Sequence, residues 1–287
     1  MTGSNSLINF GDLSKPATIL VEKVCNAVGM VYEPTHIRRK ARAEAEAERI
    51  KAAVRYELAD VEHRAVERFV RQEARKQENI EKITAKAVEF LPKNADAQNL
   101  DEDWVAHFFK QCDTVSDSEM QTLWSRLLSG EASVPGTFSK RTVSFISYLD
   151  KKDAELFTKF CQFVWGMDDL APLIYEINDE IYKKQGISFD DLKHLDAIGL
   201  ISYEPIHGYI RTGFQQKDVI QYFEKRTNIE FSAEKKYEIS IGHVIFTSVG
   251  EELFEICGAE SNEDFYKYIL NRLIGQGIIL SSEFVSP

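Results

Sequence analysis

The chain of 287 residues is 44% hydrophobic and 28% charged, which is typical of a globular protein with one large domain or two modest ones. Its formal net charge of −11 argues against broad coating of nucleic acid or of an anionic membrane, although a local basic patch is compatible with it. The N-terminal residues lack the basic start and the apolar core of a secretory signal, and no run approaches the roughly 18 apolar residues of a spanning helix. We therefore expect a cytoplasmic protein.

Four cysteines lie far apart in the chain, and none belongs to a CxxC pair. Two of them, Cys112 and Cys161, fall within apolar helical patterns. Such cysteines are usually buried thiols, whereas disulfide frameworks are typical of small secreted proteins. We therefore expect free thiols at all four positions, which are Cys25, Cys112, Cys161 and Cys257.

Residues 1–35 predict a short amphipathic helix. Ser14 is a suitable N-cap, and Pro16 fits the first turn of a helix that ends near Gly29. Its apolar stripe indicates docking on the rest of the protein or on a second copy. Contact of residues 16–31 with a membrane is the alternative, which is disfavoured because the polar side carries few cations. The stripe consists of Leu20, Val24, Ala27, Val28 and Val31.

Residues 36–91 contain no glycine or proline and consist largely of alanine, glutamate, arginine and lysine, all good helix formers. A single helix of this length would be about 80 Å long, and its apolar positions are too sparse to stabilise it alone. The segment therefore predicts a long charged helix or a helical hairpin, with a coiled-coil-like contact between subunits as one way to stabilise it. Its basic start is a candidate contact for nucleic-acid phosphates, although a solvated helix end is the simpler interpretation. This start comprises Arg38, Arg39, Lys40 and Arg42.

Several capped amphipathic helices follow one another over residues 92–184. Ser116, with Glu119 three residues later, is predicted to cap one of them, and Asp150 is predicted to cap another. Apolar residues recur at helical spacing in each segment. The region therefore predicts an all-α helical bundle.

The turn EASVPGTF is the most distinctive stretch of this region. Ser139, Lys140 and Arg141 follow it at a predicted helix N-terminus, where free amides favour an anion. The alternative, which we favour, is a structural joint in which Ser139 caps the next helix and Glu131 pairs with Arg141. The joint comprises Trp124, Gly130, Glu131, Pro135, Gly136 and Ser139.

Residues 185–287 change in character and predict an α+β module that resembles a winged helix. The expected order is a helix from Ser188, a strand at 200–203, a hairpin strand, a strand over 237–247 and a helix from Ser248. The first helix carries more acidic than basic side chains, which disfavours tight binding to duplex DNA. We therefore expect this module to dock a protein rather than nucleic acid.

No enzyme motif is visible in the sequence. The chain lacks GxSxG, P-loop, Rossmann and HExxH patterns and any cysteine–histidine ligand set, and its six histidines are scattered. We therefore predict no catalytic, cofactor-binding or metal-binding residues and no cofactor, although distant residues can still converge in a folded site.

Five stretches carry a resemblance to a known family. They are GDLSKPATILVEKVCNAVG, IRRKARAEAEAERIKA, MQTLWSRLLSGEASVPGTFSKRTVSFISYLDKKDAELF, DLKHLDAIGLI and HVIFTSVGEELFEI. Together, and in this order, they resemble the bacterial domain-of-unknown-function family two-eight-zero-six. The resemblance implies a cytoplasmic bacterial protein with a role in phage defence. It supplies no reaction and no catalytic residues.

The sequence thus predicts a mainly α protein with a long N-terminal charged helix, a central helical bundle and a C-terminal winged-helix-like α+β module. We expect a non-enzymatic interaction and assembly protein of antiphage defence. It would form a homo-oligomer through its N-terminal helices and dock or sense a protein partner with its C-terminal module. The alternatives are a nucleic-acid-binding winged-helix regulator, an effector enzyme with a non-standard site, and a membrane-active helical protein.

Overall fold

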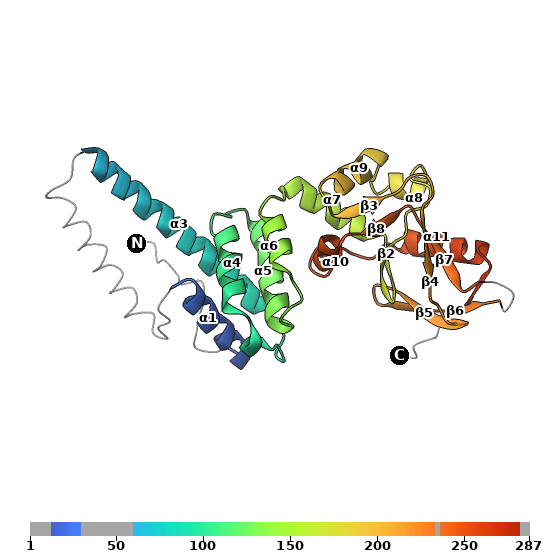
Figure 1. Cartoon of the computed structure of the whole chain (residues 1–287), viewed down its shortest axis with the longest axis horizontal. Helices are drawn as coiled ribbons and strands as arrows, with labels where there is room; N and C mark the ends of the chain where they lie inside the picture. Colours follow the sequence, from blue (N-terminus) through green and yellow to red (C-terminus); the bar gives the residue numbers. More distant parts are fainter. Residues whose placement is uncertain (1–12, 30–59, 233–235, 282–287) are drawn as a thin grey trace. The chain divides into compact units, whose positions relative to one another are not determined.

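The computed structural model describes residues 13–29, 60–232 and 236–281 of the chain (Figure 1). The chain divides into two compact units, Met1–Tyr148 and Leu149–Pro287. The described part of the first unit is all-α, whereas the second unit contains helices and three antiparallel sheets. The protein therefore has a mixed α+β fold in which helix predominates.

The first unit consists of helices packed around buried aromatic and aliphatic side chains. The ring of Phe108 lies at the centre of this core, with its centroid 5.2 Å from those of Trp104 and Trp124. The described elements are α1 (Lys15–Ala27), α3 (Asp60–Phe90), the 3₁₀ helix η1 (Ala97–Asn99), α4 (Glu102–Cys112), α5 (Ser118–Ser133) and α6 (Lys140–Ile146).

The short helix α1 docks on α4 through its apolar side. Ser14 caps α1, because its hydroxyl accepts a hydrogen bond from the Ala17 amide at 3.4 Å. Leu20 and Val24 are buried, and Lys23 forms a 3.5 Å ion pair with Glu102 of α4. The apolar stripe predicted for docking is therefore occupied within the first unit, as far as the structure describes it.

α3 and α5 pack along a seam that is both apolar and polar. Asn79 Nδ2 donates a hydrogen bond to the Asp113 carbonyl at 2.8 Å, and Gln121 Nε2 donates to Asn79 Oδ1 at 3.3 Å. The Ser125 hydroxyl, also on α5, lies 3.0 Å from the buried carbonyl of Ile83. Because these buried polar groups are paired, they fix the position of α3 without a large desolvation penalty.

The residue that caps α5 is Asp117, so the cap predicted at Ser116 is wrong by one position. The Asp117 carboxylate accepts hydrogen bonds from the Glu119 and Met120 amides, each at 3.0 Å. The Ser116 hydroxyl instead accepts a hydrogen bond from Arg75 Nη2 of α3 at 3.0 Å. Both residue types are good caps, so the local sequence does not distinguish them.

The second unit is built around a five-stranded antiparallel sheet with the order β2-β1-β5-β6-β9, and two smaller sheets pair β3 with β8 and β4 with β7. The strands are β1 (Val164–Met167), β2 (Asp169–Pro172), β3 (Ile201–Tyr203), β4 (Tyr209–Thr212), β5 (Lys217–Tyr222), β6 (Lys225–Phe231), β7 (Glu238–Gly242), β8 (Val244–Phe246) and β9 (Ile278–Ser281). The helices are α7 (Lys151–Cys161), α8 (Glu180–Lys183), α9 (Phe189–Ala197), α10 (Ser248–Phe254) and α11 (Glu263–Gly275).

Aromatic side chains join α11 to the buried face of the large sheet. The ring of Tyr266 stacks on Trp165 of β1 with a centroid distance of 5.5 Å. The ring of Phe265 lies 5.9 Å from Tyr222 of β5. Trp165, Tyr222 and Phe265 are fully buried, so the core of this unit lies between α11 and the sheet.

The all-α bundle predicted over residues 92–184 is wrong in its C-terminal part. α7 belongs to the second unit, and residues 164–172 form the β1–β2 hairpin. Asp168 lies between the two strands in the left-handed region, with a φ of 67°. Short strands buried on both sides carry an unbroken apolar run, which periodicity does not distinguish from a buried helix.

The module at residues 185–287 contains more β-structure than predicted. α9, β3 and α10 lie at their predicted positions, and the strand predicted over 237–247 is divided into β7 and β8. The break follows Gly242, which has a φ of 88° and contacts the Ile174 carbonyl so closely that a Cβ would lie 1.9 Å from its oxygen. β5, β6 and β9 were not predicted, and the winged-helix arrangement stays a prediction.

Candidate interaction surface

The first half of α3 exposes nearly all of its side chains. From Val61 to Arg75, every side chain except that of Val66 is exposed. Large apolar groups are among them, with Phe69 63% exposed and Val70 44% exposed. We call this segment, residues 61–75, the exposed half of α3. Its apolar residues lie on one broad side of the helix because they recur at spacings of three and four; they are Val61, Ala65, Val66, Phe69, Val70 and Ala74.

Four arginines lie on the opposite side of the same segment. Their spacings of four, three and four residues place them in one line along the helix axis. One of them, Arg71, forms a 3.7 Å ion pair with Glu67, and the two side chains are 81% and 55% exposed. Exposed pairs of this kind are weak, so Arg71 remains able to bind another anion. The line consists of Arg64, Arg68, Arg71 and Arg75.

The second half of α3 is anchored to α5 and to the α4–α5 turn. Lys76 forms a 3.3 Å ion pair with Asp113, and this carboxylate raises the pKa of Lys76 mainly through a hydrogen bond. Lys86 Nζ donates hydrogen bonds to the Ser118 carbonyl at 2.9 Å and to Thr122 Oγ1 at 3.2 Å. The exposed half therefore continues from a helix whose other half is held in place.

The structure describes only one of the two predicted anion sites. The basic cluster Arg38, Arg39, Lys40 and Arg42 lies outside the described residues. Ser139, Lys140 and Arg141 are described and are exposed at the start of α6, a helix of only seven residues. The Ser139 hydroxyl accepts a hydrogen bond from the Thr142 amide at 3.2 Å, so one of the free amides is capped by the chain itself.

The residues of the predicted joint meet around a buried carboxylate. Glu131 is only 3% exposed, and its oxygens accept hydrogen bonds from the Gly136 amide at 2.7 Å and the Phe138 amide at 2.8 Å. Pro135 lies within the loop that these bonds close. Glu131 therefore binds backbone amides, whereas the sequence predicted an ion pair between Glu131 and Arg141. A negative charge buried beside the turn also opposes binding of a second anion there.

Aromatic packing holds the other side of this joint. Gly130 faces the ring of Phe138, and a Cβ at this position would lie 2.6 Å from Phe138 Cε2. Trp104 Nε1 donates a hydrogen bond to the Phe138 carbonyl at 2.8 Å. Trp124 is fully buried and packs edge-on against Phe108 at 5.2 Å. Five residues of the predicted joint thus lie at the corner between α5 and α6, whereas Trp124 packs against Phe108 in the core of the first unit.

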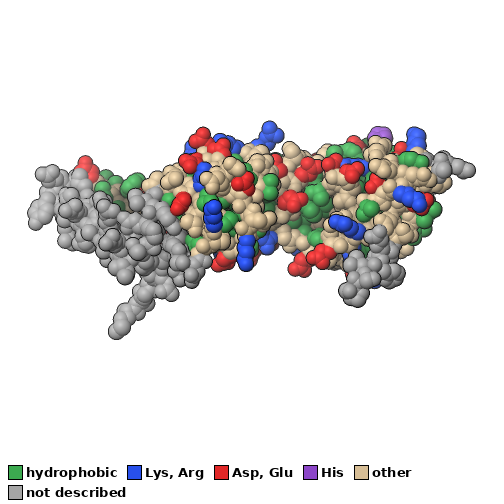
Figure 2. Space-filling model, turned by 90° about the horizontal axis from the view of Figure 1, so that it is seen from below, with side chains coloured by type: hydrophobic (Ala, Val, Ile, Leu, Met, Phe, Trp, Pro, Cys, Tyr) green, Lys and Arg blue, Asp and Glu red, His purple; other side chains and the backbone are tan. Residues whose placement is uncertain are grey.

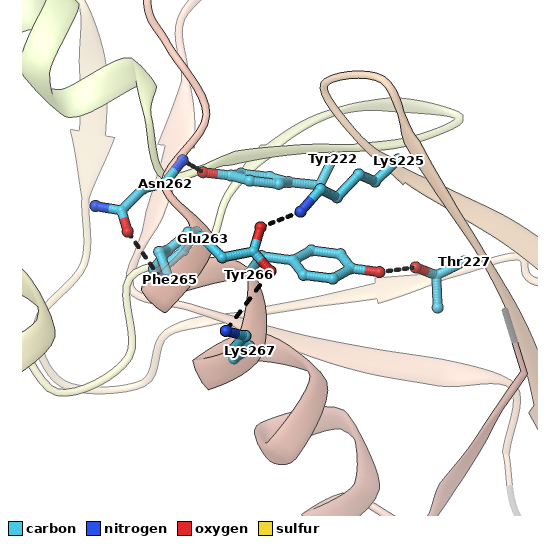
Figure 3. Close-up of polar contacts among 8 residues, drawn as sticks. All are labelled: Tyr222, Lys225, Thr227, Asn262, Glu263, Phe265, Tyr266 and Lys267. Carbon is cyan, nitrogen blue, oxygen red and sulfur yellow. Dashed lines mark hydrogen bonds and ion pairs between the residues drawn. The ribbon is translucent and has the colours of Figure 1, made fainter.

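A polar and aromatic cluster in the second unit was not predicted from the sequence. Figure 3 shows that residues of α11 and the β5–β6 hairpin pair with one another: Lys225 with Glu263, and Tyr266 with Thr227 at 3.1 Å. Lys225 Nζ also lies 4.5 Å from the centroid of the Tyr266 ring. These contacts use the polar groups within the protein, so the cluster acts as a clamp between helix and hairpin.

A second cluster joins α11 to α8 and the segment before it. The Tyr268 hydroxyl donates a hydrogen bond to Asp179 Oδ2 at 2.8 Å, and Arg272 Nη2 lies 3.2 Å from the same oxygen. The Tyr182 hydroxyl donates to the buried Leu173 carbonyl at 2.9 Å, and burial raises its pKa far above the usual range. A phenol held neutral in this way stabilises the fold and is a poor general base.

A family model described as "Protein of unknown function (DUF2806)" matches residues 63–270. The chain belongs to this family. The match begins within the exposed half of α3 and ends within α11, so it covers parts of both units of the DUF2806 chain. The family predicted from the five stretches is therefore confirmed, whereas the association with phage defence stays a prediction. A search of curated proteins and a search of solved structures each found no match.

Within residues 13–29, 60–232 and 236–281, no group of three or more histidine, cysteine, aspartate or glutamate residues is arranged to hold a metal ion. Among the described helices, none combines the length and the apolar character needed to cross a membrane. Figure 2 shows basic and acidic side chains interspersed on the face that it presents.

Proposed function

We propose that this chain is a non-enzymatic interaction and assembly protein that associates with a second copy of itself through the exposed half of α3. The observation that carries the proposal is the exposure of large apolar side chains on a highly charged helix. Val61 is 67% exposed and Phe69 is 63% exposed. Packing against a matching helix would remove this surface from water, which is the main driving force of helix association in solution.

The charge distribution supports an antiparallel arrangement of the two copies. Residues 61–67 carry two carboxylates and one arginine, whereas residues 68–75 carry three arginines and one carboxylate. Two helices that run in opposite directions bring the acidic half of each to the level of the basic half of the other, which lowers the long-range repulsion even though the arginines lie on the side opposite the apolar contact. A parallel pair would place like charges together. The antiparallel contact is isologous, with its two-fold axis near residues 67 and 68, and two-fold dimers are the commonest oligomers.

The oligomeric state of the full chain tests self-association. Size-exclusion chromatography with light scattering is expected to give the mass of a dimer for the wild type. The double variant Phe69→Glu, Val70→Glu is expected to be a monomer, because it places carboxylates in the apolar contact. The control double variant Ile206→Glu, Ile210→Glu introduces the same two carboxylates at residues that are 78% and 61% exposed in the second unit, and it should remain dimeric. A wild type that is monomeric at every concentration would overturn the proposal.

The orientation of the helices has its own test. Spin labels on Val66→Cys lie on the apolar side, close to the proposed two-fold axis, and should be near each other in the dimer. Labels on Val61→Cys lie near the end of the exposed half and should be about 20 Å apart along the axis, at 1.5 Å per residue. A parallel dimer would give short distances at both positions. That result would contradict the antiparallel arrangement and leave self-association intact.

A second candidate function is nucleic-acid binding, which the line of arginines on α3 favours. Arg68 and Arg71 lie at its centre, and phosphate contacts of this kind make affinity fall steeply with salt. The double variant Arg68→Glu, Arg71→Glu should then abolish a gel shift seen at low salt with DNA or RNA. A wild type that gives no shift at low salt would exclude this function.

The proposed assembly would serve antiphage defence, with the second unit docking or sensing a protein partner. The defence role is the expectation that came with the sequence resemblance, and the matching family model is itself described as a protein of unknown function. The acidic character of α9 supports docking of a protein by a winged-helix-like surface, because Asp190, Asp191 and Asp196 would repel phosphates. Bacteria that express the wild type should restrict phage more than bacteria that express the Phe69→Glu, Val70→Glu variant at the same level. Equal plaque counts with and without the wild type, over a broad panel of phages, would contradict the defence role.

A further inference from the structure

Two cysteines that lie far apart in the sequence meet in the second unit. Cys161 is the last residue of α7, and Cys257 follows the end of α10 by three residues. The Thr158 hydroxyl, one helical turn before Cys161, donates a hydrogen bond to the Cys257 carbonyl at 3.1 Å. This bond places the two cysteines next to each other, and Cys257 is one of the neighbours that raise the pKa of the Cys161 thiol. Neither cysteine forms a disulfide in the structure.

The surroundings of the two thiols differ. Cys161 is fully buried, beside a cluster of aromatic rings that includes Phe160 and Phe246, 6.0 Å apart. Burial and the neighbouring Cys257 both raise the pKa of the Cys161 thiol, so Cys161 stays protonated. Cys257 is partly exposed, and its sulfur lies 3.2 Å from the Phe254 carbonyl. A soluble oxidant therefore reaches Cys257 first, since thiol oxidation follows exposure.

We propose that Cys161 and Cys257 are an oxidisable dithiol, a modification site that a hydroperoxide converts into a disulfide. The Cys257 thiolate attacks one oxygen of hydrogen peroxide, the O–O bond breaks, and the departing hydroxide takes a proton to leave as water. Cys257 is then a sulfenic acid. The Cys161 sulfur attacks the Cys257 sulfur and gives up its proton, and the hydroxyl of the sulfenic acid leaves with that proton as a second water. The two thiols lose two electrons in total, and the peroxide gains them.

The disulfide would connect the first helix of the second unit to the segment after α10. A cross-link that closes so long a loop restrains the unfolded chain more than the folded one. Because α7 is already hydrogen-bonded to Cys257 through Thr158, the two cysteines are neighbours and the bond requires only a local movement of the folded unit. Oxidation should therefore stabilise the second unit, and reduction should reverse the effect. The oxidation of this dithiol does not depend on the self-association proposed for the exposed half of α3, because both cysteines belong to the second unit.

Peptide mapping of the full-length protein after treatment with hydrogen peroxide tests this inference. The wild type should give a peptide pair joined through Cys161 and Cys257, two hydrogens lighter than the sum of the separate peptides and released by dithiothreitol. The unfolding temperature of the wild type should rise on oxidation and return on reduction. In Cys161→Ala, the sulfenic acid of Cys257 should persist and react with dimedone. In Cys257→Ala, peroxide should leave Cys161 reduced.

Cys112→Ala is the matched control, because Cys112 is also fully buried but lies in the first unit. This variant should form the Cys161–Cys257 bond as the wild type does. The inference is overturned if Cys257 of the wild type is oxidised while Cys161 still reacts with an alkylating reagent after unfolding. It is also overturned if peroxide joins Cys161 to Cys25 or Cys112 as readily as to Cys257. The wild-type measurements decide the question even if a variant does not fold.

Discussion

Gly130 of α5 and Phe138, which precedes α6, are in such close contact that no side chain fits between them: a Cβ at Gly130 would lie 2.6 Å from Phe138 Cε2. The same loop is closed on its other side by the buried Glu131 carboxylate. The corner between α5 and α6 is therefore defined by a close approach and a buried charge, and each can be tested by substitution.

Substitution of Gly130 by alanine should destabilise the protein. In an ordinary helix this change is favourable, but here the added methyl group must displace the buried Phe138 ring, and overpacking of this kind costs about 1–3 kcal/mol. Denaturant unfolding gives the free energy. Gly275→Ala in α11 is the matched control, because nothing lies within 4 Å of the added Cβ. That variant should be neutral or more stable by up to about 1 kcal/mol. Equal effects of the two substitutions would contradict the packing described for Phe138.

Substitution of Glu131 by glutamine should also destabilise the protein. One amide hydrogen bond is kept, but the new NH₂ group faces a backbone amide that then loses its acceptor. Loss of a buried, charged hydrogen bond costs about 1.5–3 kcal/mol. The control Arg141→Ala removes the partner that the sequence predicted, and its effect on the free energy of unfolding should stay within about 0.5 kcal/mol. A large effect of Arg141→Ala would restore the predicted ion pair.

Substitution of Ser139 by alanine should cost about 1 kcal/mol through loss of the cap on α6. Thermal or denaturant unfolding measures this loss. Lys140→Ala, at the exposed next position, should have little effect on stability and serves as the control. If Ser139→Ala left stability unchanged and abolished function, the anion site would become the better interpretation of this turn.

Stability should fall at alkaline pH because of buried tyrosines in the second unit. Burial raises the pKa of Tyr222 to about 12, and it also raises the pKa values of Tyr175 and Tyr182. Below the ordinary tyrosine pKa of about 10 these phenols are neutral in both the folded and the unfolded states, and they contribute no pH dependence. Above pH 10 the unfolded chain ionises while the folded chain does not, so the unfolded state is favoured, by up to about 1.4 kcal/mol per pH unit for each group.

Urea unfolding between pH 8 and pH 11 should therefore show a free energy that is level and then decreases from about pH 10. Tyr222→Phe should reduce the slope of the decrease. Tyr148→Phe, at a residue that is 87% exposed in the first unit, should leave the slope unchanged. A free energy that rises above pH 10 would show that the tyrosines are not held neutral.

The sequence predicts local features of this fold well and long-range pairing poorly. The caps at Ser14 and Ser188 are visible because a capping side chain lies within three residues of the amide that it binds. The hairpin of β1 and β2 was missed because its strands are short and have a continuous apolar run. β5 and β6 alternate between more exposed and more buried positions, and this alternation is typical of strands, so these two strands could have been predicted from the sequence. Pairing of β6 with β9 joins segments about 50 residues apart, which no local pattern encodes.

For the candidate sites too, the sequence predicts local features but not the contacts that depend on folding. The turn around Gly136 was predictable from its glycine and proline, but the partner of Glu131 was not, because Arg141 and two backbone amides all lie within reach along the chain. Burial decides between them: the Phe138 amide is buried and binds the carboxylate, whereas Arg141 is exposed and reaches water. Contact between Cys161 and Cys257 likewise depends on how α7 and α10 pack. The exposed half of α3 was foreseen as a thinly apolar helix that needs a partner.

The order of strands in the large sheet has a consequence for folding kinetics. Its central strands are β1, β5 and β6, and the sheet is complete only when the distant β9 pairs with β6. The first unit relies on helices that form from local contacts. Chains with local contacts generally fold faster than chains that must first close long loops. The helical unit should therefore acquire its structure early, and the sheet of the second unit should form in a separate, slower phase during which its strand edges are open to misassembly.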